Sequence, residues 1–121
     1  MKTERILLIG GTGALGQQLI KRHHKDNEIV VFSRDEHKHV NLSQIYPKLE
    51  YRIGDVKDTQ SIIQALHDYQ PTIVINTAAL KHVPVCETNA IESVKTNIIG
   101  HQNLIDAIML SKHRIKYLLF I

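Results

Sequence analysis

A chain of 121 residues, of which 43% are hydrophobic, can bury one core and form a single globular domain. Its 15 basic and 12 acidic residues are interspersed, which argues against a nucleic-acid partner despite a net charge of +3. No apolar run approaches the ~20 residues that span a bilayer, and the N-terminus lacks the apolar segment of a signal peptide, so we expect a cytoplasmic protein with no membrane partner.

Strand and helix patterns alternate along the chain with short connections. Apolar and β-branched runs predict strands at 5–9, 28–32, 49–53, 72–76 and 117–121. Apolar residues at three- and four-residue steps predict helices at 14–25, 59–69 and 88–111, with a short helix at 41–46 and Asp58 as a helix cap. The alternation predicts an α/β fold, a doubly wound parallel sheet of order 3-2-1-4-5, in one domain over 1–121.

Cysteine and histidine leave little scope for metal chemistry. Cys86 is the single cysteine, so the chain cannot form an internal disulfide or a thiolate cluster, as expected in a reducing compartment. The eight histidines are scattered and match neither HExxH nor a Cys/His knuckle. We therefore predict no metal site.

The connection between the first strand and the first helix is rich in glycine. Gly10, Gly13 and Gly16 satisfy the pattern GxxGxxG, and Gly11 begins an overlapping GxGxxG. Glycine allows a sharp turn and a close approach to a ligand, while the amides at the helix start point toward an anion. This context predicts a phosphate cradle for a dinucleotide. The alternative is a turn that only packs the strand tightly against the helix.

The residues after the second strand bear on the choice of cofactor. Arg34 can pair with a 2′-phosphate, Ser33 can donate a hydroxyl hydrogen bond, and Lys38 lies one short loop away. These residues favour NADP. Asp35 could instead accept a hydrogen bond from a ribose hydroxyl and permit NAD. Alternatively, Arg34 and Lys38 belong to a solvated basic loop.

Two further segments follow the third and fourth strands. Asp55 could receive the adenine amino group, and Val56 could pack on the adenine ring. Thr77, Ala78 and Ala79 have small side chains that would let the backbone lie close to the ribose and pyrophosphate. Both segments fall on the edge where open α/β sheets bind ligands. Asp55 could alternatively cap the next helix.

These segments together resemble the extended short-chain dehydrogenase/reductases. Within them, the chain resembles the CapD-like polysaccharide-biosynthesis branch, which includes inverting UDP-N-acetylglucosamine 4,6-dehydratases. The resemblance covers essentially the whole chain and rests on residues 10–16, 33–36, 54–56, 78–84 with Glu87, and 95–100. The segment ALKHVP, at 79–84, is its most specific part.

The resemblance implies a set of cofactor contacts. Thr12, Gly13, Ala14 and Leu15 would line the pyrophosphate, residues 33–38 the adenosine phosphate, Asp55 and Val56 the adenine, and Thr77 and Ala78 the ribose. Lys81 would contact both the cofactor and a nucleotide-sugar substrate, and Asn97 would support the active site. An exposed loop lysine and a buried amide satisfied by backbone are the alternatives at these two positions.

The chain departs from the family pattern in its catalytic residues. Relatives place a Ser/Thr-x-Asp-Lys segment after the fifth strand and a Tyr-x-x-x-Lys pair on the next helix, and neither occurs here. Acid and base chemistry needs such groups within reach of the sugar, so we predict no catalytic residue in this chain.

We therefore expect the NADP-binding, N-terminal portion of a nucleotide-sugar 4,6-dehydratase, a lyase, present as a fragment or split gene product. An apolar strand at 117–121 without a covering helix suggests a homo-oligomer. The alternatives are a non-catalytic NADP-binding sensor or interaction module, and a fragment of a UDP-sugar 4-epimerase.

Overall fold

Five parallel strands form one sheet at the centre of the molecule. The computed structural model describes residues 4–77, 102–111 and 115–120. The strands are β1 (Arg5–Ile9), β2 (Glu28–Ser33), β3 (Glu50–Ile53), β4 (Ile73–Asn76) and β5 (Tyr117–Phe120). Their order is β3-β2-β1-β4-β5, and every neighbouring pair is parallel. The predicted α/β class and strand order are both confirmed.

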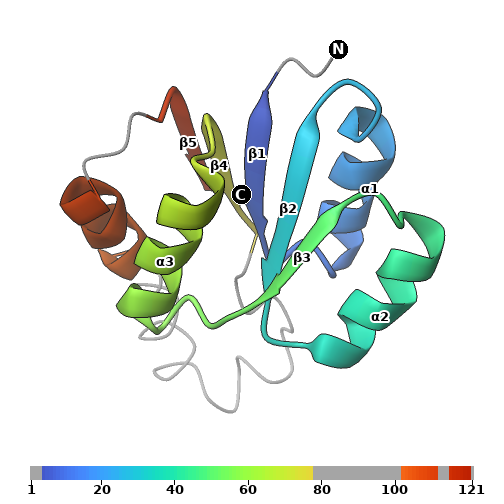
Figure 1. The fold of residues 1–121 in the computed structure, drawn as a ribbon, viewed down its shortest axis with the longest axis horizontal. Coiled ribbons are helices and arrows are strands. Elements are labelled where there is room, and N and C mark those ends of the chain that lie inside the picture. Colours follow the sequence, from blue (N-terminus) through green and yellow to red (C-terminus); the bar gives the residue numbers. More distant parts are fainter. Residues whose placement is uncertain (1–3, 78–101, 112–114, 121) are drawn as a thin grey trace, which may run out of the picture.

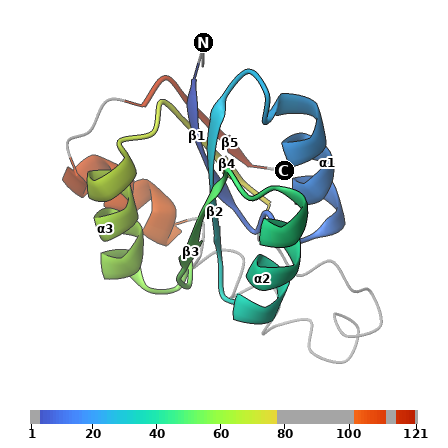
Figure 2. The same cartoon turned by 45° about the vertical axis from the view of Figure 1, so that its right-hand side comes forward.

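Helices cover both faces of this sheet. They are α1 (Ala14–His23), α2 (Glu36–Ile45), α3 (Thr59–Tyr69) and a further helix at residues 102–111. Figures 1 and 2 show α1 and α2 on one face of the sheet, and α3 with the helix at 102–111 on the other. The sheet is therefore doubly wound, and its two cores follow from strand alternation. Leu7 and Ile9 belong to the core that contains α3, whereas Ile6 and Leu8 belong to the core that contains α1 and α2.

The helices differ from the predicted boundaries mainly at α2, which begins at Glu36 and not near residue 41. Asp35 is the physical reason, because its side chain accepts a hydrogen bond from the Lys38 backbone N–H and starts the helix early. Lys38 consequently lies on a helix, so the alternative of a basic loop is wrong for this residue. The predicted cap at Asp58 is confirmed, since this side chain accepts hydrogen bonds from the backbone of Gln60 and Ser61.

The remaining shifts are small. The helix α1 ends at His23 and not at residue 25, and β2 extends one residue further, to Ser33. The strands β3 and β4 each start one residue later than expected. Of the predicted helix 88–111, only the part from residue 102 lies within the described residues. No helix among the described residues is long and apolar enough to cross a membrane.

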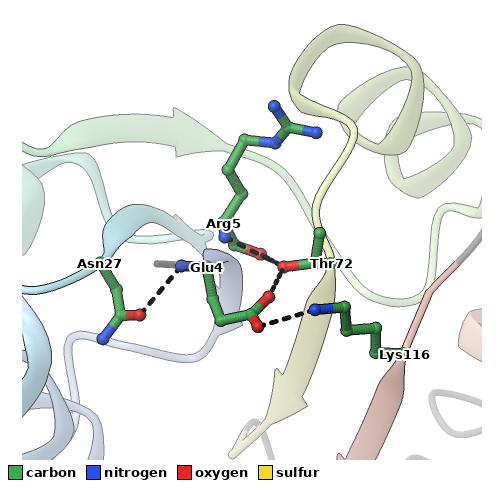
Figure 3. Close-up of polar contacts among 5 residues, drawn as sticks. All are labelled: Glu4, Arg5, Asn27, Thr72 and Lys116. Carbon is green, nitrogen blue, oxygen red and sulfur yellow. Dashed lines mark hydrogen bonds and ion pairs between the residues drawn. The ribbon is translucent and has the colours of Figure 1, made fainter. Parts of the chain in front are cut away.

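A polar cluster joins the strands at the amino edge of the sheet (Figure 3). The Thr72 hydroxyl donates to Glu4 Oε2 at 2.5 Å, and Lys116 Nζ donates to Glu4 Oε1 at 2.9 Å. The Glu4 backbone N–H donates to Asn27 Oδ1 at 3.1 Å, and the Arg5 N–H donates to the Thr72 hydroxyl at 3.0 Å. Because these residues precede or begin β1, β2, β4 and β5, one carboxylate and its neighbours hold four strand starts together.

This cluster gives the stability of the fold a defined acid dependence. Hydrogen bonds from Thr72 and Lys116 lower the pKa of Glu4 from its ordinary value. A lowered folded-state pKa means that the stabilisation is present above the unfolded-state pKa and is lost as the pH falls through the folded-state pKa. We expect Glu4→Gln to lower the thermal unfolding midpoint at neutral pH, by a margin that shrinks in acid.

Thermal unfolding followed by circular dichroism across the acid range measures this margin. Glu28→Gln is the matched control, because Glu28 is an exposed carboxylate at the start of β2 that does not belong to the cluster. A Glu4→Gln midpoint equal to that of the control at neutral pH would contradict the assignment.

Candidate functional site

The glycine turn between β1 and α1 builds the centre of the site. Gly10 has φ 78°, in the left-handed region that favours glycine, and its N–H donates to the Phe32 carbonyl at 2.8 Å. The turn is thereby tied to β2. A Cβ on Gly16 would lie 2.4 Å from the Cα of Gly11, so α1 packs directly on the turn. Gly10 therefore allows the chain to turn, whereas Gly16 allows α1 to pack closely on the turn.

The start of α1 is left open by the same glycines. Gly13 is the N-cap and makes no side-chain capping bond, and the first turn of α1 holds no acidic residue. By contrast, α2 and α3 are capped by the carboxylates of Asp35 and Asp58. The partly positive helix start of α1 can accordingly accept an external anion, which an acidic cap would repel.

A cavity of about 350 Å³ lies at the carboxyl edge of the sheet beside this turn. Residues at the ends of the first four strands, with the turn and the start of α2, line it: Ile9, Gly10, Thr12, Gly13, Phe32, Ser33, Arg34, Asp35, Lys38, Gly54, Asp55, Val56 and Thr77. The structure thus brings together ten of the predicted site residues from four segments. Ala14, Leu15 and Gly16 lie in the first turn of α1, outside the lining, and Ala78, Ala79, Lys81 and Asn97 lie outside the described residues.

A larger cavity of about 580 Å³ lies at the opposite, amino edge, where its lining includes His24, Tyr46, Lys48 and Tyr69. Open parallel sheets bind their ligands at the carboxyl ends of the strands, near the point where the strand order reverses. In this sheet the strand order reverses between the neighbouring strands β1 and β4. We therefore assign the site to the smaller cavity.

Cationic and anionic groups meet at the mouth of the cavity. Arg34 Nη1 lies 3.9 Å from Asp55 Oδ2, and the two side chains are 69% and 37% exposed. An exposed ion pair at this distance contributes little energy, so Arg34 can turn to a phosphate without a large loss. One oxygen of Asp35 is used by the α2 cap, which reduces its capacity to accept a ribose hydroxyl.

The loop after β3 is held by contacts from two directions. Asp55 Oδ1 accepts a hydrogen bond from the Lys57 N–H at 2.9 Å, which forms a turn before the α3 cap. The Asn103 side chain, on the helix at 102–111, donates to the Lys57 carbonyl at 2.8 Å. Asp55 thus shapes the loop, while the capping of α3 belongs to Asp58. Sequence reasoning missed Asn103, because no local pattern reveals a contact 46 residues away.

Thr77 lies at the junction of the turn and β4. Its hydroxyl donates to the Ile9 carbonyl at 2.8 Å, and its backbone N–H donates to the same carbonyl at 2.8 Å. The side chain therefore ties the end of β4 to the end of β1, beside the glycine turn. A ligand in the cavity would meet Thr77 as a rigid part of the wall.

His39 contacts the site residue Ser33, and sequence reasoning missed it. Its Nε2 lies 2.6 Å from the Ser33 Oγ, its side chain is only 5% exposed, and its ring packs at 5.7 Å from the Tyr51 ring. Burial lowers the pKa of His39, although the nearby carboxylates of Asp35 and Glu36 oppose the shift. A sequence signal for its burial does exist. His39 and Leu42 are three residues apart, which places both on one face of a helix, and this is the buried face of α2.

The topology and the open glycine turn define a Rossmann-type domain. The sequence profile of the family described as "Polysaccharide biosynthesis protein" matches residues 6–121, and the chain belongs to that family. This finding confirms the resemblance drawn from the motifs.

Individual relatives are nucleotide-sugar enzymes. The chain is 42% identical over 109 residues to a UDP-N-acetylglucosamine 4,6-dehydratase (inverting) of Campylobacter jejuni subsp. jejuni serotype O:2. The aligned region covers 86% of this chain and 32% of that protein. It is 38% identical over 117 residues to a UDP-glucose 4-epimerase of Rickettsia typhi, with 88% and 33% covered. The chain spans about a third of the length of these curated relatives.

A solved structure shares the fold. The enzyme WbmG of Bordetella bronchiseptica, in complex with NAD, superposes with a TM-score of 0.79 and 28% identity. The match covers 98% of this chain and 37% of that one.

The packing of α1 on the glycine turn can be tested by a pair of alanine substitutions. We expect Gly16→Ala to lower the free energy of unfolding by about 1–3 kcal/mol, because the new methyl group meets backbone that cannot move aside. Gly13→Ala is the matched control, since a Cβ there would meet its nearest atom, the Gly10 carbonyl oxygen, at an ordinary 3.7 Å. Denaturant unfolding measures both. Equal losses in the two variants would be inconsistent with the close packing.

Proposed function

We propose that this chain binds a nicotinamide dinucleotide at the carboxyl edge of its sheet, as the cofactor-binding, N-terminal domain of a nucleotide-sugar 4,6-dehydratase. The observation that carries the proposal is the cavity that joins the uncapped start of α1 to the cations beyond β2. In Rossmann domains a dinucleotide lies along this edge, with its pyrophosphate at the start of the first helix and its adenosine beyond the second strand. The proposed substrate is UDP-N-acetylglucosamine, for polysaccharide or glycan biosynthesis in the cytoplasm.

Each part of the cofactor has candidate contacts among the chain's own residues. The backbone at Gly10, Thr12 and Gly13 would hold the pyrophosphate, because the open amides of the α1 start lie there. Asp55 and Val56 would contact the adenine from the loop after β3. When bound, the nicotinamide would supply a hydride acceptor and donor, while the residues described here bind and orient it.

The proposed cofactor is NADP in preference to NAD. Arg34 and Lys38 both line the cavity, and a guanidinium pairs well with a phosphate. Asp35, the residue that could favour NAD, has one oxygen engaged with the Lys38 N–H. The balance of charge around the adenosine end therefore supports a cofactor with an additional phosphate.

Several expectations concern residues or properties outside this geometry. Lys81 as a contact of cofactor and sugar nucleotide, Asn97 as a support of the active site, and Ala78 and Ala79 beside the ribose stay predictions. Self-association is also a proposal, supported by exposed apolar side chains on the helix at 102–111 and on β5, namely Met109, Leu110, Tyr117 and Leu119.

A UDP-sugar 4-epimerase is the second candidate, because the Rickettsia typhi relative is an epimerase. The two reactions differ in their products. A dehydratase product has lost one water, whereas an epimerase product keeps the mass of its substrate. We expect residues 1–121 alone to yield neither product from UDP-N-acetylglucosamine, because the sequence lacks the expected acid and base. Mass spectrometry of the reaction mixture checks this, and any turnover by the chain alone would overturn it.

Cofactor preference is tested by Arg34→Ala. We expect this substitution to weaken NADP binding by about ten- to a hundredfold, the loss of one charge-assisted contact, and to leave NAD binding nearly unchanged. Isothermal titration calorimetry with each cofactor measures the difference.

Lys48→Ala is the matched control for Arg34→Ala, because it removes one exposed positive charge at the opposite edge of the sheet. An equal loss of affinity for both cofactors in Arg34→Ala would exclude a 2′-phosphate contact. Absence of binding of either cofactor to the parent chain would overturn the proposed function itself.

A further inference from the structure

The Ser33 hydroxyl, in the wall of the proposed cofactor site, has a buried partner. Ser33 is the last residue of β2 and lines the cavity, and its Oγ lies 2.6 Å from the Nε2 of His39. His39 is 5% exposed, so water competes little for this bond. The hydroxyl therefore contacts the His39 imidazole and also borders the cavity.

The imidazole decides which way the hydroxyl proton points. A hydroxyl carries one hydrogen, and a neutral imidazole has one donor nitrogen and one acceptor nitrogen. If Nε2 accepts, the Ser33 O–H points at His39, and the cavity meets oxygen lone pairs. If Nε2 carries a hydrogen, it donates to the Ser33 Oγ, and the O–H turns toward the cavity. In protonated His39 both nitrogens are donors, so only the second arrangement remains.

The two arrangements suit different cofactors. Lone pairs on Ser33 can accept a hydrogen bond from a ribose 2′-hydroxyl, as in NAD. A 2′-phosphate offers acceptors, so it needs the O–H of Ser33 as a donor. Protonation of His39 removes the first arrangement and adds a positive charge next to the phosphate position, and both effects favour the phosphorylated cofactor.

We propose that His39 is a specificity-determining positioning residue, which acts through the direction of the Ser33 hydroxyl and raises the preference for NADP over NAD when it is protonated. The inference rests on the proposed binding of a nicotinamide dinucleotide in this cavity. It assigns a role to a residue that does not itself line the cavity.

The groups around His39 determine the direction in which its pKa is shifted. Burial lowers its pKa and is the largest influence, while the α2 carboxylates of Asp35 and Glu36 raise it. From β3 the ring faces Tyr51, which stays neutral because burial raises the pKa of its phenol. From β2 the ring faces the Ser33 hydroxyl. The pKa of His39 therefore lies below that of an ordinary histidine, and the imidazole gains its proton at a correspondingly lower pH.

The test compares NADP and NAD affinity in the parent chain and in His39→Gln between about pH 8 and about pH 5, the range in which histidine titrates. Glutamine keeps a hydrogen-bonding side chain but has no titration. The 2′-phosphate of NADP also titrates near this range. Its contribution cancels when the NADP-over-NAD preference of the parent chain is divided by that of the variant at each pH. We expect this quotient to rise about tenfold toward acid, the value of one hydrogen bond to a charged group.

Ser33→Ala provides a second variant at a partly exposed position, with His39 left intact. We expect its preference for NADP to rise less steeply toward acid than that of the parent chain, because the hydroxyl is missing and only the charge of His39 remains. A Ser33→Ala profile identical to that of the parent would overturn the inference, and this comparison stays valid even if His39→Gln does not fold.

Linkage supplies a readout that a purely structural histidine would not move. A ligand that favours protonated His39 must raise the pKa of His39 to the same extent. NMR titration of the His39 ring should therefore show a higher pKa with NADP bound than with NAD bound. Equal values with both cofactors, or equal pH profiles in parent and variants, would overturn the role of His39. Failure of both cofactors to bind would instead overturn the proposed function.

Discussion

The contact between the backbone of α1 at Gly16 and the backbone of the turn at Gly11 sets the geometry of the whole carboxyl edge. A side chain at Gly16 would hold the helix away from the turn, since its Cβ would fall 2.4 Å from the Gly11 Cα. Because the helix lies so close, its first amides stand directly beside the end of β1. The Gly10 N–H bond to the Phe32 carbonyl then fixes the turn against β2. The proposed phosphate position and the proposed adenosine position thus lie on segments that are joined directly to each other.

The capping of the helices explains why an anion would bind at α1 in particular. The starts of α1, α2 and α3 all lie at the carboxyl edge, because each helix follows a parallel strand. Asp35 and Asp58 neutralise two of these starts with their carboxylates. Gly13 leaves the third without a side chain. Among these three helices, the only positive end available to a ligand therefore adjoins the cavity.

Much of this architecture could be predicted from the sequence, because its signals are local. The β-branched runs gave the strands to within one residue, and Asp58 marked the start of α3. The helix α2 begins earlier than its sequence pattern predicts, because it buries only His39 and Leu42 and its apolar periodicity is therefore weak. Asp35 was considered as a cofactor contact, but its role as a helix cap depends on the backbone that follows it.

Contacts between distant segments could not be predicted in the same way. The bond from Asn103 to the Lys57 carbonyl joins a helix to a loop 46 residues earlier, and neither segment carries a pattern that names the other. The pair of Ser33 and His39 is only six residues apart, yet it requires α2 to turn back over the end of β2. A scattered histidine therefore looks like a surface residue until the helix that buries it is known.

The two edges of the sheet separate stability from ligand recognition. At the amino edge, the Glu4 carboxylate joins strand starts that are distant in sequence, through Thr72, 68 residues away, and Lys116, 112 residues away. At the carboxyl edge, the side chains of Ser33, Arg34 and Asp55 face a cavity and make few bonds that the fold requires. Because the two sets share no partner and lie at opposite ends of the strands, substitutions in one should add independently to substitutions in the other. The pKa of Glu4 is lowered from its ordinary value, so Glu4 keeps its charge over the pH range in which an ordinary histidine titrates. A change in cofactor preference in mild acid would therefore report on the site and not on loss of the fold.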